Sequence, residues 1–160
     1  MAFEKMIRNA FEESENNCRF GDTPEEIAEI RDYIKNASKI CIPNKNGIKV
    51  QVLNRVLTEY GLPEAEILQI NTNTADTSRI PALSKAYIAL DQSDADLIIA
   101  RGRLGIPGSG SLLVFIDNKG RILTAGMSPS HVIHKQSIEE AVYKESCEAL
   151  EKIGFKKIEG

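Results

Sequence analysis

The chain contains no tryptophan, only two histidines and three cysteines, and 6% aromatic residues. Its net charge is −3, so no overall positive field would attract a nucleic acid or an acidic membrane surface. Basic residues are not interleaved with aromatic ones, which further disfavours single-stranded nucleic acids as partners. Any binding of an anion must therefore come from a local group of side chains.

The apolar runs are too short to cross a bilayer, and the N-terminal segment MAFEKMIRNAFEE is acidic and amphipathic, unlike a secretory signal peptide. Cys18, Cys41 and Cys147 form no C-x-x-C pair. We interpret them as reduced, semi-buried thiols rather than as a metal cluster or a nucleophile. These features predict a cytoplasmic protein with no membrane partner, folded as a single domain.

Hydrophobic periodicity predicts strands that alternate with helices. Helices are expected over residues 3–16, 23–36, 48–60 and 137–153, and strands over residues 39–43, 66–71 and 96–100. A further helix after residue 78 is expected to turn Tyr87 inward. Residues 111–116 and 121–125 predict a hairpin. The pattern indicates an α/β fold with a mixed central sheet flanked by helices.

Three of the predicted strands end in polar loops, and in open α/β sheets ligands bind beyond the carboxyl ends of the strands. After the first strand, Lys49 lies near the opening turn of a helix. The helix dipole disfavours a cation there unless a bound phosphate compensates it. We therefore predict nucleotide binding by Lys49 together with Asn44, Lys45 and Asn46, although solvated lysines are the alternative.

The loop after the second strand is rich in hydroxyl and amide groups and contains one carboxylate, Asp76. Asp76 could hold Mg²⁺ with water completing the shell, because magnesium usually takes one or two carboxylates. The alternative is a turn aspartate bonded to its own backbone. Thr77 or Ser78 could cap the next helix. Asp94 and Asp96 are a second candidate metal pair, and each could equally cap or precede the third strand.

The third strand is followed by ARGRLGIPGSGS, in which four glycines accompany two arginines. Glycine accepts φ > 0 and has no Cβ, so such a loop exposes backbone N–H groups to a ligand. Guanidinium groups match phosphate oxygens. The spacing is neither that of a phosphate loop nor that of the dinucleotide fingerprint, and single glycines here could be structural turns. The segment predicts an anion site formed by Arg101, Gly102, Arg103, Gly105, Gly108, Ser109, Gly110 and Ser111.

His131 and His134 follow the predicted hairpin. They are too few for a zinc site, since no cysteine or further histidine is near them in sequence. One of them is better interpreted as a proton acceptor or as a hydrogen-bond partner of a substrate, because neutral imidazole is available near pH 7. A buried structural histidine is the alternative for the other.

Three segments, taken in order, resemble the inosine triphosphate pyrophosphatase superfamily: NKNGIKVQVLNRVLTEYGL, Ser84-Lys85-Ala86 and PGSGS. The resemblance implies an inosine triphosphatase-like fold with a nucleotide site. Those hydrolases carry an acidic pair after the third strand, where this chain has Arg101 and Arg103. Arginine cannot be the general base that activates water, so the resemblance favours the nucleotide site over hydrolysis.

A second resemblance spans nearly the whole chain. The segments IPNKNGIKVQVLNRVL, ARGRLGIPGSG and DNKGRILTAGMSPSHVIH are similar to those of the HcgB family of methanogenic archaea. The resemblance implies a homodimeric guanylyltransferase of iron-guanylylpyridinol (FeGP) cofactor biosynthesis, which serves Fe-hydrogenase. The implied reaction transfers GMP from GTP to a pyridinol hydroxyl and releases pyrophosphate.

In that reaction Lys49, Arg101 and Arg103, with Mg²⁺ as cofactor, would neutralise charge during in-line attack on the α-phosphorus. A hydroxypyridine is acidic enough that a strong protein base is unnecessary. Hydroxyl-rich loops are the candidates for holding the pyridinol: Thr74, Thr77, Ser78, Ser128, His131 and His134. The alternatives are a nucleoside triphosphate pyrophosphatase and a non-catalytic nucleotide-binding protein.

Overall fold

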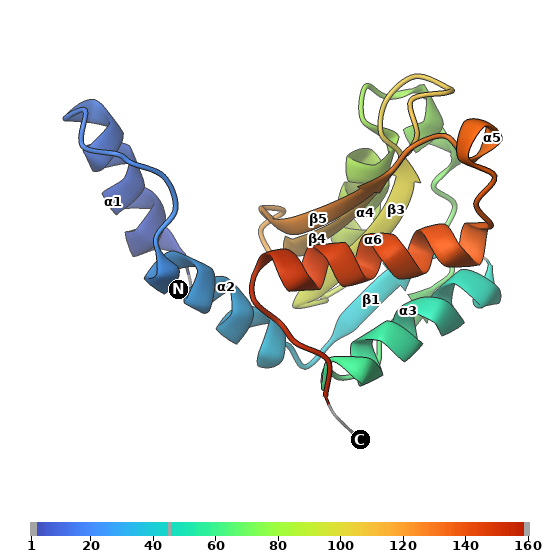
Figure 1. Cartoon of the computed structure of the whole chain (residues 1–160), viewed down its shortest axis with the longest axis horizontal. Coiled ribbons are helices and arrows are strands. Elements are labelled where there is room, and N and C mark those ends of the chain that lie inside the picture. The colour runs from blue at the N-terminus through green and yellow to red at the C-terminus, as the bar shows by residue number, and fades with distance from the viewer. Residues whose placement is uncertain (1–2, 45, 159–160) are drawn as a thin grey trace.

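In the computed structural model, which describes residues 3–44 and 46–158, helices cover both faces of a mixed sheet (Figure 1). The sheet has five strands in the order β2-β1-β3-β4-β5. The strands are β1 (Ile40–Pro43), β2 (Glu66–Leu68), β3 (Leu97–Arg103), β4 (Ser111–Asp117) and β5 (Ile122–Ser128). β1 is parallel to β2 and β3, whereas β4 is antiparallel to β3 and β5. The predicted α/β class and the predicted hairpin are confirmed.

Alternation of side chains along the strands gives the sheet two apolar faces. Leu97 and Ile99 of β3 belong to a core shared with α3 (Gly47–Glu59) and α6 (Ile138–Lys152). Ile98 belongs to a second core, beneath α4 (Pro81–Asp91). The layers are therefore α3 and α6, the sheet, and α4 (Figure 1).

The buried face of α4 differs from the prediction. Tyr87, expected to point inward, is 41% exposed, whereas Ala82, Ala86 and Ala89 are fully buried. These alanines recur at helical spacing and form a narrow stripe, which lets α4 lie close to the sheet. The size of Tyr87 was misleading, because the small residues rather than the large one face the core.

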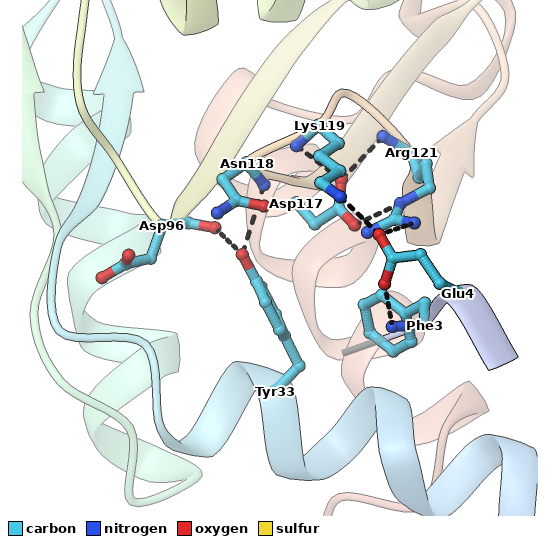
Figure 2. A network of polar contacts seen from close by, with 8 residues as sticks. All are labelled: Phe3, Glu4, Tyr33, Asp96, Asp117, Asn118, Lys119 and Arg121. Atoms are coloured by element: carbon cyan, nitrogen blue, oxygen red, sulfur yellow. Dashed lines mark hydrogen bonds and ion pairs between the residues drawn. The ribbon is translucent and has the colours of Figure 1, made fainter. Parts of the chain in front are cut away.

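The first two helices, α1 (Glu4–Glu15) and α2 (Pro24–Lys35), form an arm that projects from the sheet (Figure 1). A polar network fastens this arm to the β4–β5 turn (Figure 2). Asp117, fully buried, accepts from the backbone N–H groups of Lys119 at 3.0 Å and Arg121 at 2.8 Å. Glu4 pairs with Lys119 and Arg121, and the Lys119 ammonium lowers the pKa of the Glu4 carboxyl to about 2. The hydroxyl of Tyr33 in α2 accepts from the backbone N–H of residue 118 at 3.2 Å.

Local bonding accounts for the aspartates that precede β3. Asp96 Oδ2 accepts from the backbone N–H groups of Ser38 and Lys39, each at 3.0 Å, and Asp94 forms an ion pair with Lys39. In the part of the chain that the structure describes, no three His, Cys, Asp or Glu side chains are grouped to hold a metal ion. Cys41 and Cys147 are buried, but Cys18 is exposed, so the semi-buried interpretation is wrong for that thiol.

Within residues 3–44 and 46–158, no helix combines the length and apolar character that a bilayer span requires. The remaining elements are the 3-10 turn η1 (Asn73–Thr77) and the short helix α5 (His131–His134).

Candidate active site

A cavity of about 360 Å³ opens where β1, β2 and β3 reach their carboxyl ends. Four cationic side chains line it: Lys49, Lys85, Arg101 and Arg103. Its wall also contains Asp76, Gly102, Gly108, Gly110 and Ser111. The three polar loops that the sequence analysis singled out therefore meet at one site, as expected for the carboxyl edge of an α/β sheet.

Arg101 and its neighbours belong to β3 rather than to the loop that follows it. β3 stays paired with β4 through Arg101↔Leu113 and Arg103↔Ser111. The predicted strand end at Ala100 is therefore wrong, because antiparallel pairing with β4 carries the strand beyond its apolar run. Alternation sends Gly102 toward α4, where an added Cβ would lie 2.9 Å from the Cα of Ala82. Glycine is needed at this position to let the start of α4 approach the sheet.

A buried carboxylate holds Arg101 at the wall of the cavity. The Nε atom of Arg101 donates to Glu145 Oε1 at 2.7 Å, and its Nη2 atom donates to Glu145 Oε2 at 3.2 Å. Nη2 also donates to the Ser111 hydroxyl at 2.9 Å, and that hydroxyl donates to the same carboxylate. The Glu145 side chain is fully buried and that of Arg101 is 17% exposed. The guanidinium plane is therefore fixed before any ligand arrives.

Lys49 and Lys85 line the cavity from α3 and α4. Burial lowers the pKa of both ammonium groups below the ordinary value of a lysine. The charge of Arg101 lowers the pKa of Lys49 further, whereas the charge of Glu145 raises it. Lys85 Nζ donates to the backbone carbonyl of Arg101 at 3.1 Å. An anion that enters the cavity would offset the repulsion between the charges of Lys49 and Arg101.

Arg103 ties β3 to η1. Its Nη2 atom donates to the backbone carbonyl of Asp76 at 2.6 Å, and its Nη1 atom lies 3.8 Å from Asp76 Oδ1. The Asp76 side chain is 65% exposed, so its carboxylate is accessible at the wall. A single accessible carboxylate suits a cation that brings its own water and phosphate ligands.

The first turn of α6 completes the cavity. Ser137 caps this 15-residue helix, since its hydroxyl accepts from the backbone N–H of Glu140 at 3.1 Å. Ser137, Ile138 and Ala141 line the same cavity as the four cations. The positive end of the helix dipole thus adds to the attraction for an anion.

Comparison with known protein families identifies the family to which the chain with this cationic cavity belongs. The family model described as "FeGP cofactor biosynthesis protein HcgB, guanylyltransferase" matches residues 3–155 of the chain. The chain belongs to the HcgB family. The family resemblance inferred from the sequence is thereby confirmed. The HcgB family is a guanylyltransferase family, so the chain is a nucleotidyltransferase of FeGP cofactor biosynthesis, and the cationic cavity is its candidate nucleotide site.

Some residues of the two loops that were predicted to bind nucleotide do not line the cavity: Asn44, Asn46, Gly105 and Ser109. Asn46 caps α3 by accepting from the backbone N–H of Ile48 at 3.0 Å, and Asn44 Oδ1 accepts from the backbone N–H of Asn46 at 2.8 Å. Lys45 lies outside the described residues. In the β3–β4 loop, Ser109 Oγ accepts from the backbone N–H of Gly105 at 2.9 Å. These groups shape turns beside the site, and their contact with substrate stays a prediction.

The hydroxyls of η1 are also engaged locally. Thr77 Oγ1 donates to the carbonyl of Thr74 at 2.8 Å, and Ser78 Oγ donates to the carbonyl of Ala75 at 2.6 Å. Neither hydroxyl lines the cavity. Their predicted role in binding a pyridinol is untested.

A second pocket, of about 360 Å³, adjoins the cationic cavity and shares Pro129 and Gln136 with it. Ser128 lines this second pocket. The helix α5 lies at the same end of the sheet as the β3–β4 loop (Figure 1). The side chains of His131 and His134 lie outside the described part of the chain, so their roles stay predictions.

Sequence reasoning missed Lys85 and Glu145 as parts of the site. Ser84-Lys85-Ala86 carried the pyrophosphatase resemblance, so that motif was the available signal for Lys85. For Glu145 the signal is its place in the apolar stripe of α6. It lies four residues after Ala141 and four before Ala149, both of which are buried. A charge within such a stripe needs a partner, and Arg101 supplies it.

Proposed function

We propose that the chain transfers GMP from GTP to the 4-hydroxyl group of a pyridinol precursor of the FeGP cofactor and releases pyrophosphate. The observation that carries this proposal is the convergence of four cationic side chains and the start of α6 on one cavity. A nucleoside triphosphate is the polyanion that such a cavity suits. Nucleotidyl transfer depends on alignment and charge neutralisation more than on a covalent enzyme group.

In this proposal Lys49, Arg101 and Arg103 hold the phosphate oxygens. The pyridinol oxygen forms a bond to the α-phosphorus while the bond from that phosphorus to the leaving pyrophosphate breaks. The cations stabilise the charge that shifts onto the pyrophosphate. The pyridinol proton passes to water, since the acidity of a hydroxypyridine makes a strong protein base unnecessary.

Mg²⁺ fits the cavity through Asp76. Among the described wall residues, Asp76 supplies the carboxylate, and magnesium typically combines one or two carboxylates with phosphate oxygens and water. Bound magnesium would supply further neutralisation of phosphate charge. Arg103 supports this role because it holds the backbone of Asp76 in place.

We further propose that the pyridinol occupies the second pocket, which Ser128 lines. This pocket shares Pro129 with the cationic cavity, so a ligand there would lie beside the bound triphosphate. His131 and His134 follow Ser128 along the chain and are the remaining candidates on this side. Thr74, Thr77 and Ser78 are the candidates on the side of η1.

We also propose that the protein forms a homodimer. Ile7 and Phe11 of α1 are 47% and 63% exposed, and Phe20 in the following loop is 94% exposed. The arm and β5 also border a groove of about 510 Å³ that includes Met6 and Ile27. Exposed apolar side chains gathered on one element mark a protein interface. A second copy of the chain would cover them.

The test combines the purified protein with Mg²⁺, GTP and a 4-hydroxy-2-pyridinol that bears a carboxymethyl group, and identifies the products by mass spectrometry. A guanylylated pyridinol with pyrophosphate would support the proposal. GMP and pyrophosphate formed without the pyridinol would identify a pyrophosphatase instead. GTP bound without any product, with all components present, would identify a binding protein.

A further inference from the structure

We infer that Glu145 is a positioning residue for nucleotidyl transfer: its buried carboxylate holds the Arg101 guanidinium at the cavity wall, oriented for the phosphates before GTP binds. The inference rests on the proposed function, because it assigns the support of a proposed phosphate ligand. Glu145 itself is fully buried in α6 and does not line the cavity, whereas Arg101 does.

The bonding pattern fixes both the position and the plane of the guanidinium. Two different nitrogens of Arg101, Nε and Nη2, donate to two different oxygens of Glu145, at 2.7 Å and 3.2 Å. Ser111 bridges the pair, since its hydroxyl accepts from Nη2 and donates to the carboxylate. A long side chain that is ordered in this way loses little further freedom on binding a ligand.

Stability alone is a weak reason for a glutamate at this position. Replacing a buried ion pair with apolar residues of similar volume is often neutral or stabilising. The pair also ends at a cavity wall rather than inside a closed core, since Arg101 lines the cavity. Functional orientation of Arg101 explains why a buried carboxylate is paired with a side chain that reaches the cavity.

Glu145 also balances the charge of the cavity. Three charged groups on other elements face Lys49: Arg101 on β3, Lys85 on α4 and Glu145 on α6. Arg103 and Asp76 lie in the same cavity wall. The Glu145 charge counteracts the two causes, burial and Arg101, that lower the pKa of Lys49. Without this carboxylate, Lys49 would lose its proton at a lower pH, and GTP would lose this cationic contact earlier as the pH rises.

The experiment compares the full-length chain with Glu145→Gln. Glutamine has the same shape, but its amide nitrogen would oppose a guanidinium donor, so Arg101 loses its fixed orientation. We expect kcat for GMP transfer to fall about ten- to a hundredfold, as for a small misplacement of a reacting group. The GTP KM at pH 7 should change by less than about threefold, because the four cations remain in the wall. The alkaline loss of GTP affinity should begin at a lower pH than in the parent chain.

Two further variants separate orientation from charge. Glu145→Asp keeps the charge but shortens the side chain, so we expect a reduced kcat with the alkaline loss of affinity as in the parent chain. Glu64→Gln removes the same charge from an exposed position between α3 and β2, outside the cavity wall, and both readouts should stay unchanged. Thermal unfolding of each variant shows that it is folded at the assay temperature.

An unchanged pH dependence of GTP affinity in Glu145→Gln would overturn the inference. A higher GTP KM with an unchanged kcat would also overturn it. Such a result would mean that Glu145 supports GTP binding but does not align Arg101 for the transfer step. If Glu145→Gln does not fold, an undiminished kcat in Glu145→Asp overturns the inference, and a reduced kcat at unchanged KM supports it. If the parent chain binds GTP but transfers no GMP, the proposed function fails, and the pH dependence of GTP affinity still tests Glu145.

Discussion

Replacing Gly126 of β5 with alanine tests whether the close approach of α6 sets the geometry of the cavity. A Cβ at this position would lie 2.0 Å from the carbonyl oxygen of Glu145 and 2.8 Å from its carbonyl carbon. Both atoms are backbone, so they cannot turn aside as the end of a side chain can. Ordinary contact begins near 3.4 Å, so α6 would have to move by about 1.4 Å relative to β5.

The displacement carries both an energetic and a functional consequence. Overpacking of this kind costs about 1–3 kcal/mol of unfolding free energy and occasionally more. In a chain of this length each kcal/mol lowers Tm by about 2–4 °C, so we expect a fall of roughly 2–12 °C. The same movement would stretch the 2.7 Å bond between Arg101 and Glu145 beyond hydrogen-bond range. GMP transfer should then fall by about two orders of magnitude, the effect of a misplacement near 1 Å.

The assay is thermal unfolding followed by circular dichroism, together with GMP transfer measured well below the Tm of the variant. Gly47→Ala is the matched control for stability, because an added Cβ there meets no atom within 4 Å and the residue begins α3. Its Tm should be equal to or above that of the parent chain. A Gly126→Ala variant whose Tm and rate of GMP transfer equal those of the parent chain would refute the inference that the close approach of α6 to β5 sets the geometry of the cavity.

Three other expectations concern the ligand and the assembly. Lys85→Met should weaken GTP binding at least tenfold, since a charged hydrogen bond contributes about 1.5–3 kcal/mol, and calorimetry showing an unchanged Kd would contradict its role. Because the pKa values of Lys49 and Lys85 are lowered, GTP should bind with net proton uptake and more weakly as pH rises through those values. Titrations in buffers of different ionisation enthalpy measure that uptake, and net proton release would be the contrary result. Phe11→Glu places a charge on the exposed face of α1 and should shift the protein toward the monomer in analytical ultracentrifugation, whereas an unaltered sedimentation coefficient would exclude this face as the interface.

The convergence of the strand-end loops was predictable because it follows from local pattern and topology. Lys49, Asp76 and Arg101 each come after an apolar run with strand character, and parallel strands deliver such residues to one edge of the sheet. The positive φ angles of Gly108 and Gly110 agree with the turn chemistry expected of the glycine loop. These inferences needed only neighbours along the chain.

The errors came from interactions between distant segments. The strand β3 runs to Arg103 because β4 pairs with it, and nothing between residues 96 and 103 encodes that partner. Glu145 lies 44 residues from Arg101 in sequence, and several other glutamates share its helix. The apolar stripe of α6 marks Glu145 as buried, but only the folded chain shows that its partner is Arg101. Sequence reasoning therefore predicted residues of the cavity wall more readily than the groups that support them.

Extension of β3 past its apolar run changes how the site works as well as where the strand ends. In a strand, consecutive side chains point to opposite faces, so Arg101 reaches Glu145 of α6 while Gly102 meets α4. A flexible loop would have to order its arginines when the triphosphate binds, whereas here the β3–β4 ladder and a buried carboxylate have already done so. In the proposed reaction the side chain of Arg101 would therefore be ordered by folding rather than by binding, which would leave more of the binding energy to stabilise the transition state.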